Sequence, residues 1–167
     1  SENIRSSLTH KNTRNNDKFA ALNRIKKSAD AELQFTLAHF YDQLGLDVTD
    51  QKKEEIVAPM RNKESASYYD MQYHYEKEAL RHFYRAVTLN PISSKYHIAY
   101  AEYLDFVAKK TFPGEKLNPM IKSVIVHHFQ TATEIDNKWD HPFRSYGNWL
   151  FSYAKSEEVC DKSDLLN

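Results

Sequence analysis

The feature that most constrains this chain is a similarity between its segments at a fixed offset of 46 residues. The stretch HFYRAVTLNP (His82–Pro91) matches HFQTATEIDN (His128–Asn137) at His, Phe and Ala, and Leu-Asn is replaced by Ile-Asp. The same offset aligns YHIAYAEYLDFVAKK (96–110) with PFRSYGNWLFSYAKS (142–156). Two consecutive segments that recur at one offset indicate a repeated unit, which is typical of a solenoid whose units pack on their neighbours.

Apolar residues recur at helical spacing through most of the chain, and no segment shows the sustained alternation of a strand. One apolar stripe, for example, runs from Tyr68 through Tyr75 and Phe83 to Val87. Only three glycines and five prolines are present in 167 residues, which leaves few positions for tight turns. We therefore predict an all-α fold in one domain, with helices at 28–45, 64–90, 93–110, 120–135 and 141–156.

Residues with strong preferences for helix ends set the expected boundaries. Ser28 is placed to cap the first helix, and Gly45 is placed to end it because glycine adopts the left-handed conformation easily. Pro91 ends the second helix, and Pro119 suits the first turn of the fourth. The segment 46–63 is predicted to be a long connection with one short helical piece.

The repeated helix pair resembles the tetratricopeptide repeat (TPR) family. In that family the first helix of each repeat carries a large residue, then a small one, then a second large residue three positions after the small one. Three segments of this chain match the pattern: Leu37-Ala38 with Tyr41, Tyr100-Ala101 with Leu104, and Tyr146-Gly147 with Leu150. The second helix carries Ala, an aromatic residue, Ala and Pro, and the matching residues are Ala79, Phe83, Ala86 and Pro91, followed by Ile125, Phe129 and Ala132. The resemblance implies a helix-pair solenoid of about two and a half repeats, which we place at residues 28–156.

Small residues give this pattern a physical meaning. Ala38, Ala101 and Gly147 occupy one position in three successive first helices, where a small side chain lets another helix approach the backbone. The helix predicted at 141–156 is the first helix of a repeat unit, and no helix that could pair with it follows in this sequence. We therefore expect its apolar face to be covered by the tail, by a continuation or by a partner, and it is a second candidate interface that includes some of Phe143, Trp149, Phe151 and Tyr153.

The repeat units depart from a regular TPR unit, which is about 34 residues long. The connection 46–63 and the loop 111–119 are both enlarged, which favours a fixed subunit or adaptor. The half-a-TPR (HAT) family, common in RNA-processing scaffolds, is the alternative, because YAEYLDF and YGNWLFSY resemble its first helix. The acidic and arginine pair that would support the HAT interpretation is not evident.

The TPR resemblance implies a function, because such proteins bind partner segments along the concave surface that the first helices line. We predict a non-catalytic adaptor or assembly subunit that binds a helix or segment of a protein partner. The partner-binding positions carried over from the family are Phe35, His39, Ile98, Glu102, Phe106, Arg144, Asn148 and Phe151. The carboxylate clamp of chaperone-binding members is replaced by Phe35, His39, Ala99, His141 and Ser145, so we expect no binding of chaperone tails.

Charge is balanced over the whole chain but not along it. Lys plus Arg and Asp plus Glu both number 23, whereas residues 1–28 hold seven basic and two acidic side chains. We interpret residues 1–27 as a basic, partly helical arm and residues 157–167 as a polar, frayed tail. A nucleic acid or an acidic partner is the alternative ligand of the arm, which would make the protein a nucleic-acid-associated scaffold.

No motif for catalysis is present. The chain lacks a phosphate-binding glycine loop, a Gly-x-Ser-x-Gly elbow and a His-Glu-x-x-His pair. Asp70, His74, Glu78 and His82 follow one another at a spacing that can hold a metal, but no second group of ligands accompanies them. A solvated, salt-bridged helix face is the favoured interpretation, and we predict no enzymatic activity, no metal and no cofactor.

Cys160 is the single cysteine, so no disulfide can form within the chain. This composition favours a reducing intracellular compartment, the cytoplasm or the nucleus, with the mitochondrion as a further option. No apolar run reaches about 18 residues, so we expect no membrane span.

Overall fold

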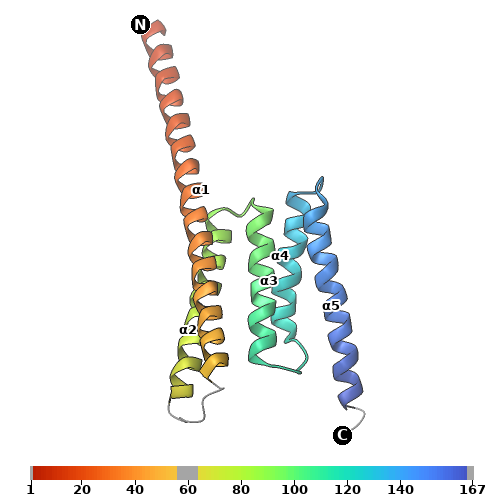
Figure 1. The fold of residues 1–167 in the computed structure, drawn as a ribbon. Helices are drawn as coiled ribbons and strands as arrows, with labels where there is room; N and C mark the ends of the chain where they lie inside the picture. The colour runs from red at the N-terminus through yellow and green to blue at the C-terminus, as the bar shows by residue number, and fades with distance from the viewer. Residues whose placement is uncertain (1, 56–63, 165–167) are drawn as a thin grey trace.

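The computed structural model describes the backbone of residues 2–55 and 64–164, and side chains within residues 20–47, except residue 22, and 71–158. This part of the chain consists of five α-helices and contains no strand (Figure 1), which confirms the predicted all-α class. The helices are α1 (Glu2–Glu55), α2 (Glu64–Leu89), α3 (Ser94–Thr111), α4 (Pro119–Ile135) and α5 (Asp140–Asp164).

The helices stand side by side in chain order, and each runs opposite to the one before it (Figure 1). The most extensive packing contacts are between α1 and α2 and between α3 and α4. Helix α2 also packs on α3, and α5 contacts both α3 and α4. The N-terminal part of α1 projects beyond the other helices (Figure 1). At about 1.5 Å per residue, the 54 residues of α1 correspond to a rod of about 80 Å.

Two predicted boundaries in α1 are wrong, because the helix passes through both Ser28 and Gly45 without a break. Residues 46–55 of the predicted connection are helical as well, whereas 56–63 lie outside the described residues. The reason is visible at Gly45, which is buried against α2. Packing of α1 on α2 offsets the low helix propensity of glycine, which sequence spacing alone cannot show.

The remaining boundaries follow local chemistry. Helix α2 ends just before Pro91, and α3 begins directly after Ser93, as predicted. Pro119 occupies the first position of α4, where the Asn118 side chain accepts a hydrogen bond from the Met120 N–H at 2.9 Å.

Helix α5 starts at Asp140 and continues to Asp164. The prediction of a frayed tail from residue 157 is therefore wrong as far as Asp164. Cys160 lies within α5, but its side chain is outside the described residues.

Replacing Gly45 by alanine is expected to raise the free energy of unfolding by about 0.5–1 kcal/mol, because alanine favours the helix. A Cβ at this position would lie 3.8 Å from Tyr75 Cβ and 4.0 Å from Glu76 Cγ, which is ordinary contact. The matched control is Gly114→Ala, which should destabilise because Gly114 has φ of 79°. Urea unfolding of both variants checks this, and a loss of stability in Gly45→Ala would contradict it.

The buried apolar residues of the core form three clusters, two between α1, α2 and α3 and one between α3, α4 and α5. Between α1, α2 and α3, the buried apolar residues are Ala31, Ala38, Ala79, Phe83, Ala86, Val87, Tyr96 and Tyr103. Between α3, α4 and α5 they are Ile98, Ala101, Ile125, Phe129, Ala132 and Trp149. The prediction that Phe83 and Phe129 are packing residues is confirmed, since they are 3% and 0% exposed.

Two histidines, His97 and the partly exposed His128, form a contact between α3 and α4. His97 Nε2 lies 2.9 Å from the Pro91 carbonyl oxygen, and His97 Nδ1 lies 2.8 Å from His128 Nδ1. A carbonyl can only accept, so Nε2 carries the proton of neutral His97 and the His128 Nδ1–H donates to His97 Nδ1. Burial lowers the pKa of both imidazoles, that of His128 to about 4, where the neighbouring His97 and His127 add to the effect.

Candidate partner-binding groove

A groove of about 370 Å³ is lined by residues of α1, of α3 and of the start of α5. Phe35 comes from α1, Ile98 and Glu102 come from α3, and Trp139 and His141 come from the turn before α5 and its first residues. Phe35, Ile98 and Glu102 are three of the predicted partner-binding residues, and the fold brings them together although 67 positions separate the first from the last.

The apolar floor of the groove, formed by Phe35 and Ile98, packs against aromatic rings of the core. The Phe35 ring centroid lies 5.7 Å from that of Phe83 and 5.1 Å from that of Tyr96. Ile98 is 4% exposed, so it belongs mainly to the core and offers only its edge to the groove. Trp139, in contrast, is 68% exposed and stands at the rim. The floor thus packs directly on the core, and its accessible apolar surface comes from Phe35 and Trp139.

An ion-pair network fixes one edge of the groove. Lys95 Nζ lies 3.3 Å from Glu32 Oε1 and 4.3 Å from the centre of the Phe35 ring. The Tyr96 hydroxyl donates to Glu32 Oε2 at 2.5 Å. The hydrogen bond from Tyr96, together with Lys95, lowers the pKa of the Glu32 carboxyl, so Glu32 remains charged at neutral pH.

Glu102 lies at another edge of the groove, and its carboxyl pKa is shifted in the opposite direction from that of Glu32. Desolvation raises the pKa of its carboxyl, although the residue is exposed, and His141 and the Ser145 hydroxyl only oppose this shift. Because the Glu102 carboxylate is exposed and its charged form is disfavoured, an incoming cation would be a favourable contact. The groove therefore combines an apolar floor with two carboxylates. Asp136 accepts a hydrogen bond from the Ser94 hydroxyl at 3.3 Å, and Glu102 is the one that an incoming basic group would stabilise.

Two other predicted site residues lie beside the groove. The His39 ring centroid is 4.5 Å from that of Phe35 and 5.1 Å from that of Phe83, so His39 supports the floor without lining it. Phe106 is 43% exposed on α3 and contacts Tyr103, at 5.7 Å between ring centroids.

The three predicted residues of α5 do not line the groove. Arg144, Asn148 and Phe151 are exposed, and Arg144 pairs with Asp140 of its own helix at 2.9 Å. The TPR resemblance placed them on the concave side, but the residues of α5 that line the groove are His141 and Pro142. Trp139 was missed because it stands in a turn between helices; an exposed tryptophan next to predicted first-helix positions is the signal that could have revealed it.

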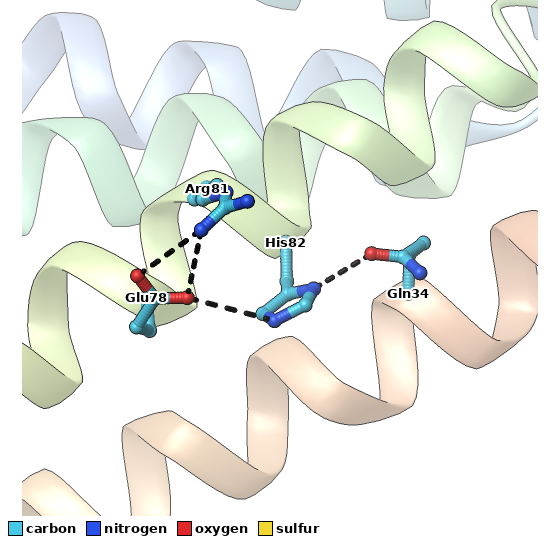
Figure 2. A network of polar contacts seen from close by, with 4 residues as sticks. All are labelled: Gln34, Glu78, Arg81 and His82. Carbon is cyan, nitrogen blue, oxygen red and sulfur yellow. Dashed lines mark hydrogen bonds and ion pairs between the residues drawn. The ribbon is translucent and has the colours of Figure 1, made fainter.

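Of the four residues on α2 at a spacing that can hold a metal, Glu78 and His82 make contacts within the protein. His74 is exposed, and the side chain of Asp70 lies outside the described residues. His82 Nδ1 lies 2.6 Å from Gln34 Oε1 of α1, while Glu78 lies 3.4 Å from Arg81 and 3.9 Å from His82 Nε2 (Figure 2). His82 is 8% exposed, so it belongs to the α1–α2 contact and not to a solvated face. Among the residues whose side chains are described, no group of three or more His, Cys, Asp or Glu is placed to hold a metal ion.

A larger hollow of about 970 Å³ opens between the loop after α3 and the second half of α5. Its lining includes Phe112, Leu117 and Ile121, with Tyr153 and Lys155 from α5. None of the predicted partner-binding residues contributes to it. Size alone does not identify a binding site, and the smaller groove is the one in which the predicted residues converge.

Comparisons with protein-family models, with curated proteins and with solved structures return no match. The fold and the groove therefore define this protein by class, as an all-helical protein whose neighbouring helices pack against one another. The resemblance to the TPR family stays a prediction. Within the described helices, none combines the length and apolar character that crossing a membrane requires.

Proposed function

We propose that this protein is a non-catalytic adaptor or assembly subunit with a TPR-like helix-pair fold, and that it binds a segment of a protein partner in the α1–α3–α5 groove. The convergence of Phe35, Ile98 and Glu102 in that groove carries the proposal. The equivalent packing of Phe83 and Phe129, one repeat offset apart, supports the helix-pair repeat.

The groove indicates the chemistry of the partner segment. Its volume of about 370 Å³ accommodates anchoring side chains and not a whole helix. An apolar anchor would pack between Phe35 and Trp139, and a neighbouring Lys or Arg would meet Glu102. The segment we propose therefore carries an aromatic or aliphatic residue close to a basic one.

The test compares variants in a cross-linking pull-down from the native source. Trp139→Ala and Glu102→Gln alter exposed groove residues, and we expect each to weaken capture of a groove partner at least about tenfold, with unchanged helicity and Tm. Ile98 is unsuitable, because truncating a residue that is 4% exposed costs about 2–5 kcal/mol in stability. Met120→Ala, at a residue 79% exposed on α4, is the matched control.

The same experiment separates the second candidate, a HAT-like or nucleic-acid-associated scaffold. Arg24, Lys26 and Lys27 are exposed on α1, which favours contact with an acidic partner. Capture that survives both groove variants, but is lost in high salt and on deletion of residues 1–27, would replace the groove proposal by this one.

A further inference from the structure

The exposed face of α2 carries cations and tyrosines together. Tyr73 and Tyr84 are 63% and 54% exposed. Lys77, Arg81 and Arg85 follow one another at steps of four residues, which places them on one side of the helix, and all three are exposed. Lys77 and Arg81 lie between the two tyrosines along the helix. We call these five residues the basic tyrosine face of α2.

Most of the positive charge on this face has no acidic partner. Glu78, at its border, lies 3.4 Å from Arg81 (Figure 2). Glu76 is buried and forms an ion pair with α3. Neither Lys77 nor Arg85 has an acidic partner among the described side chains. A negatively charged ligand would therefore meet two cations whose charge is not compensated within the protein.

The ring of Tyr84 is positioned by the fold before any ligand arrives. Its centroid lies 5.6 Å from that of Tyr100 of α3, and the Tyr100 ring lies 4.8 Å from that of His128 of α4. Tyr84 is thus supported on one side by a row of rings, while about half of its surface faces solvent. A ring held in this way loses little conformational entropy when a ligand stacks on it.

We propose that the basic tyrosine face of α2 binds single-stranded nucleic acid. Bases stack on the two tyrosine rings, and phosphates contact the cations between and beside them. Every base has a π-face, so a surface of this kind is tolerant of sequence. A single strand fits better than a duplex, because its unstacked bases are free to leave the strand and stack on aromatic side chains.

Other occupants fit this face less well. An apolar helix would remove the cations from water without offering them a counter-charge. In a symmetric dimer of this chain, the isologous contact would place the same cations against one another. Solvated Lys and Arg side chains also need no covering segment, so the face is not an unfinished part of the core. An acidic protein segment would meet the cations but leave the tyrosine rings unused.

This surface goes beyond the proposed partner groove and does not depend on it. No residue of α2 lines the groove. The basic arm of residues 1–27 belongs to α1. Variants on α2 therefore leave both of these regions intact, and failure of one proposal leaves the other standing.

The test measures fluorescence anisotropy of labelled oligouridylate and oligothymidylate with the intact 167-residue chain. The strands are about 12 nucleotides long, within the usual site sizes, and saturable binding is expected at about 50 mM salt. Tyr73→Ala should weaken binding at least about fivefold without changing its salt dependence, because it removes a stacked base and no phosphate contact. Arg85→Gln should reduce the slope of log Kd against log salt concentration by about 0.7, because one phosphate contact is lost.

Matched variants separate stacking and local charge from general effects. Tyr73→Phe keeps the ring and should bind as the wild type does. Tyr84→Ala removes the second ring and should act as Tyr73→Ala does. Lys155→Gln removes an exposed cation from α5 and should leave the affinity and the slope unchanged. An unchanged Tm of each variant excludes misfolding as the cause of lost binding.

Three outcomes would overturn the proposal. The first is the absence of saturable binding of both oligonucleotides. The second is binding that neither tyrosine-to-alanine variant weakens; if Lys26→Gln with Lys27→Gln abolishes it, the strand lies on α1. The third is a labelled polyglutamate of the same length that binds as tightly as the strands, since the partner would then be an acidic protein. Tighter binding of oligouridylate would assign RNA to the face, and tighter binding of oligothymidylate would assign DNA; both support the proposal.

Discussion

Replacing Phe129 by alanine is expected to lower the free energy of unfolding by about 3–5 kcal/mol. The side chain is 0% exposed and joins three helices, with its ring centroid 5.5 Å from that of Tyr146 and 5.7 Å from that of Trp149. Truncation removes the buried ring and leaves a cavity that the helix backbones around it cannot close. Because a domain of this size is stable by only about 5–15 kcal/mol, such a loss is a large share of the total.

Urea unfolding followed by circular dichroism measures this effect, with the slope of the transition compared between variants. Phe151→Ala is the matched control, because it removes the same ring from a residue that is 73% exposed, and its effect should stay within about 0.5 kcal/mol. A Phe129→Ala protein that loses less than about 1 kcal/mol would show that α5 does not form a common core with α3 and α4.

Phe129 also shows which features of the fold could be predicted from the sequence. The offset of 46 residues predicts that Phe83, Phe129, Ala86 and Ala132 are packing residues, because a repeat needs the same volumes at the same positions, and all four are buried. The all-α class and most helix starts followed from periodicity and from local cap chemistry. These features depend on residues close in sequence, so spacing was sufficient to predict them.

Features that depend on distant contacts were not predictable in this way. Helix α1 continues through Gly45 because α2 packs there, which the preference of glycine for helix ends could not reveal. For the site, Phe35, Ile98 and Glu102 converge as expected, but Arg144 and Phe151 do not. The rotation of α5 about its own axis, which depends on how Trp149 packs in the core, decides which of its residues face the groove.

Lowering the pH from 7 to 5 is expected to destabilise the protein through the pair of histidines, His97 and His128, that joins α3 to α4. Burial sets the pKa of folded His128 at about 4, well below the value near 6.5 expected in the unfolded chain. Between these two pH values the unfolded state therefore binds more protons than the folded state. The stability that neutral His128 contributes is fully present above pH 6.5 and is lost as the pH falls toward 4. At pH 5 the loss from His128 alone is about 2 kcal/mol, and the lowered pKa of His97 adds to it in the same direction.

The geometry suggests a variant that isolates this contribution. In His128→Asn the side-chain amide N–H can still donate to His97 Nδ1, but the residue no longer titrates. The fall in Tm between pH 7 and pH 5, roughly 4–8 °C for about 2 kcal/mol, should shrink in this variant. His74→Asn removes an exposed histidine of α2 and should keep the wild-type pH dependence. An equal fall of Tm in His128→Asn and wild type would mean that the imidazole contact between α3 and α4 is not held neutral, because protonating it would then cost the fold nothing.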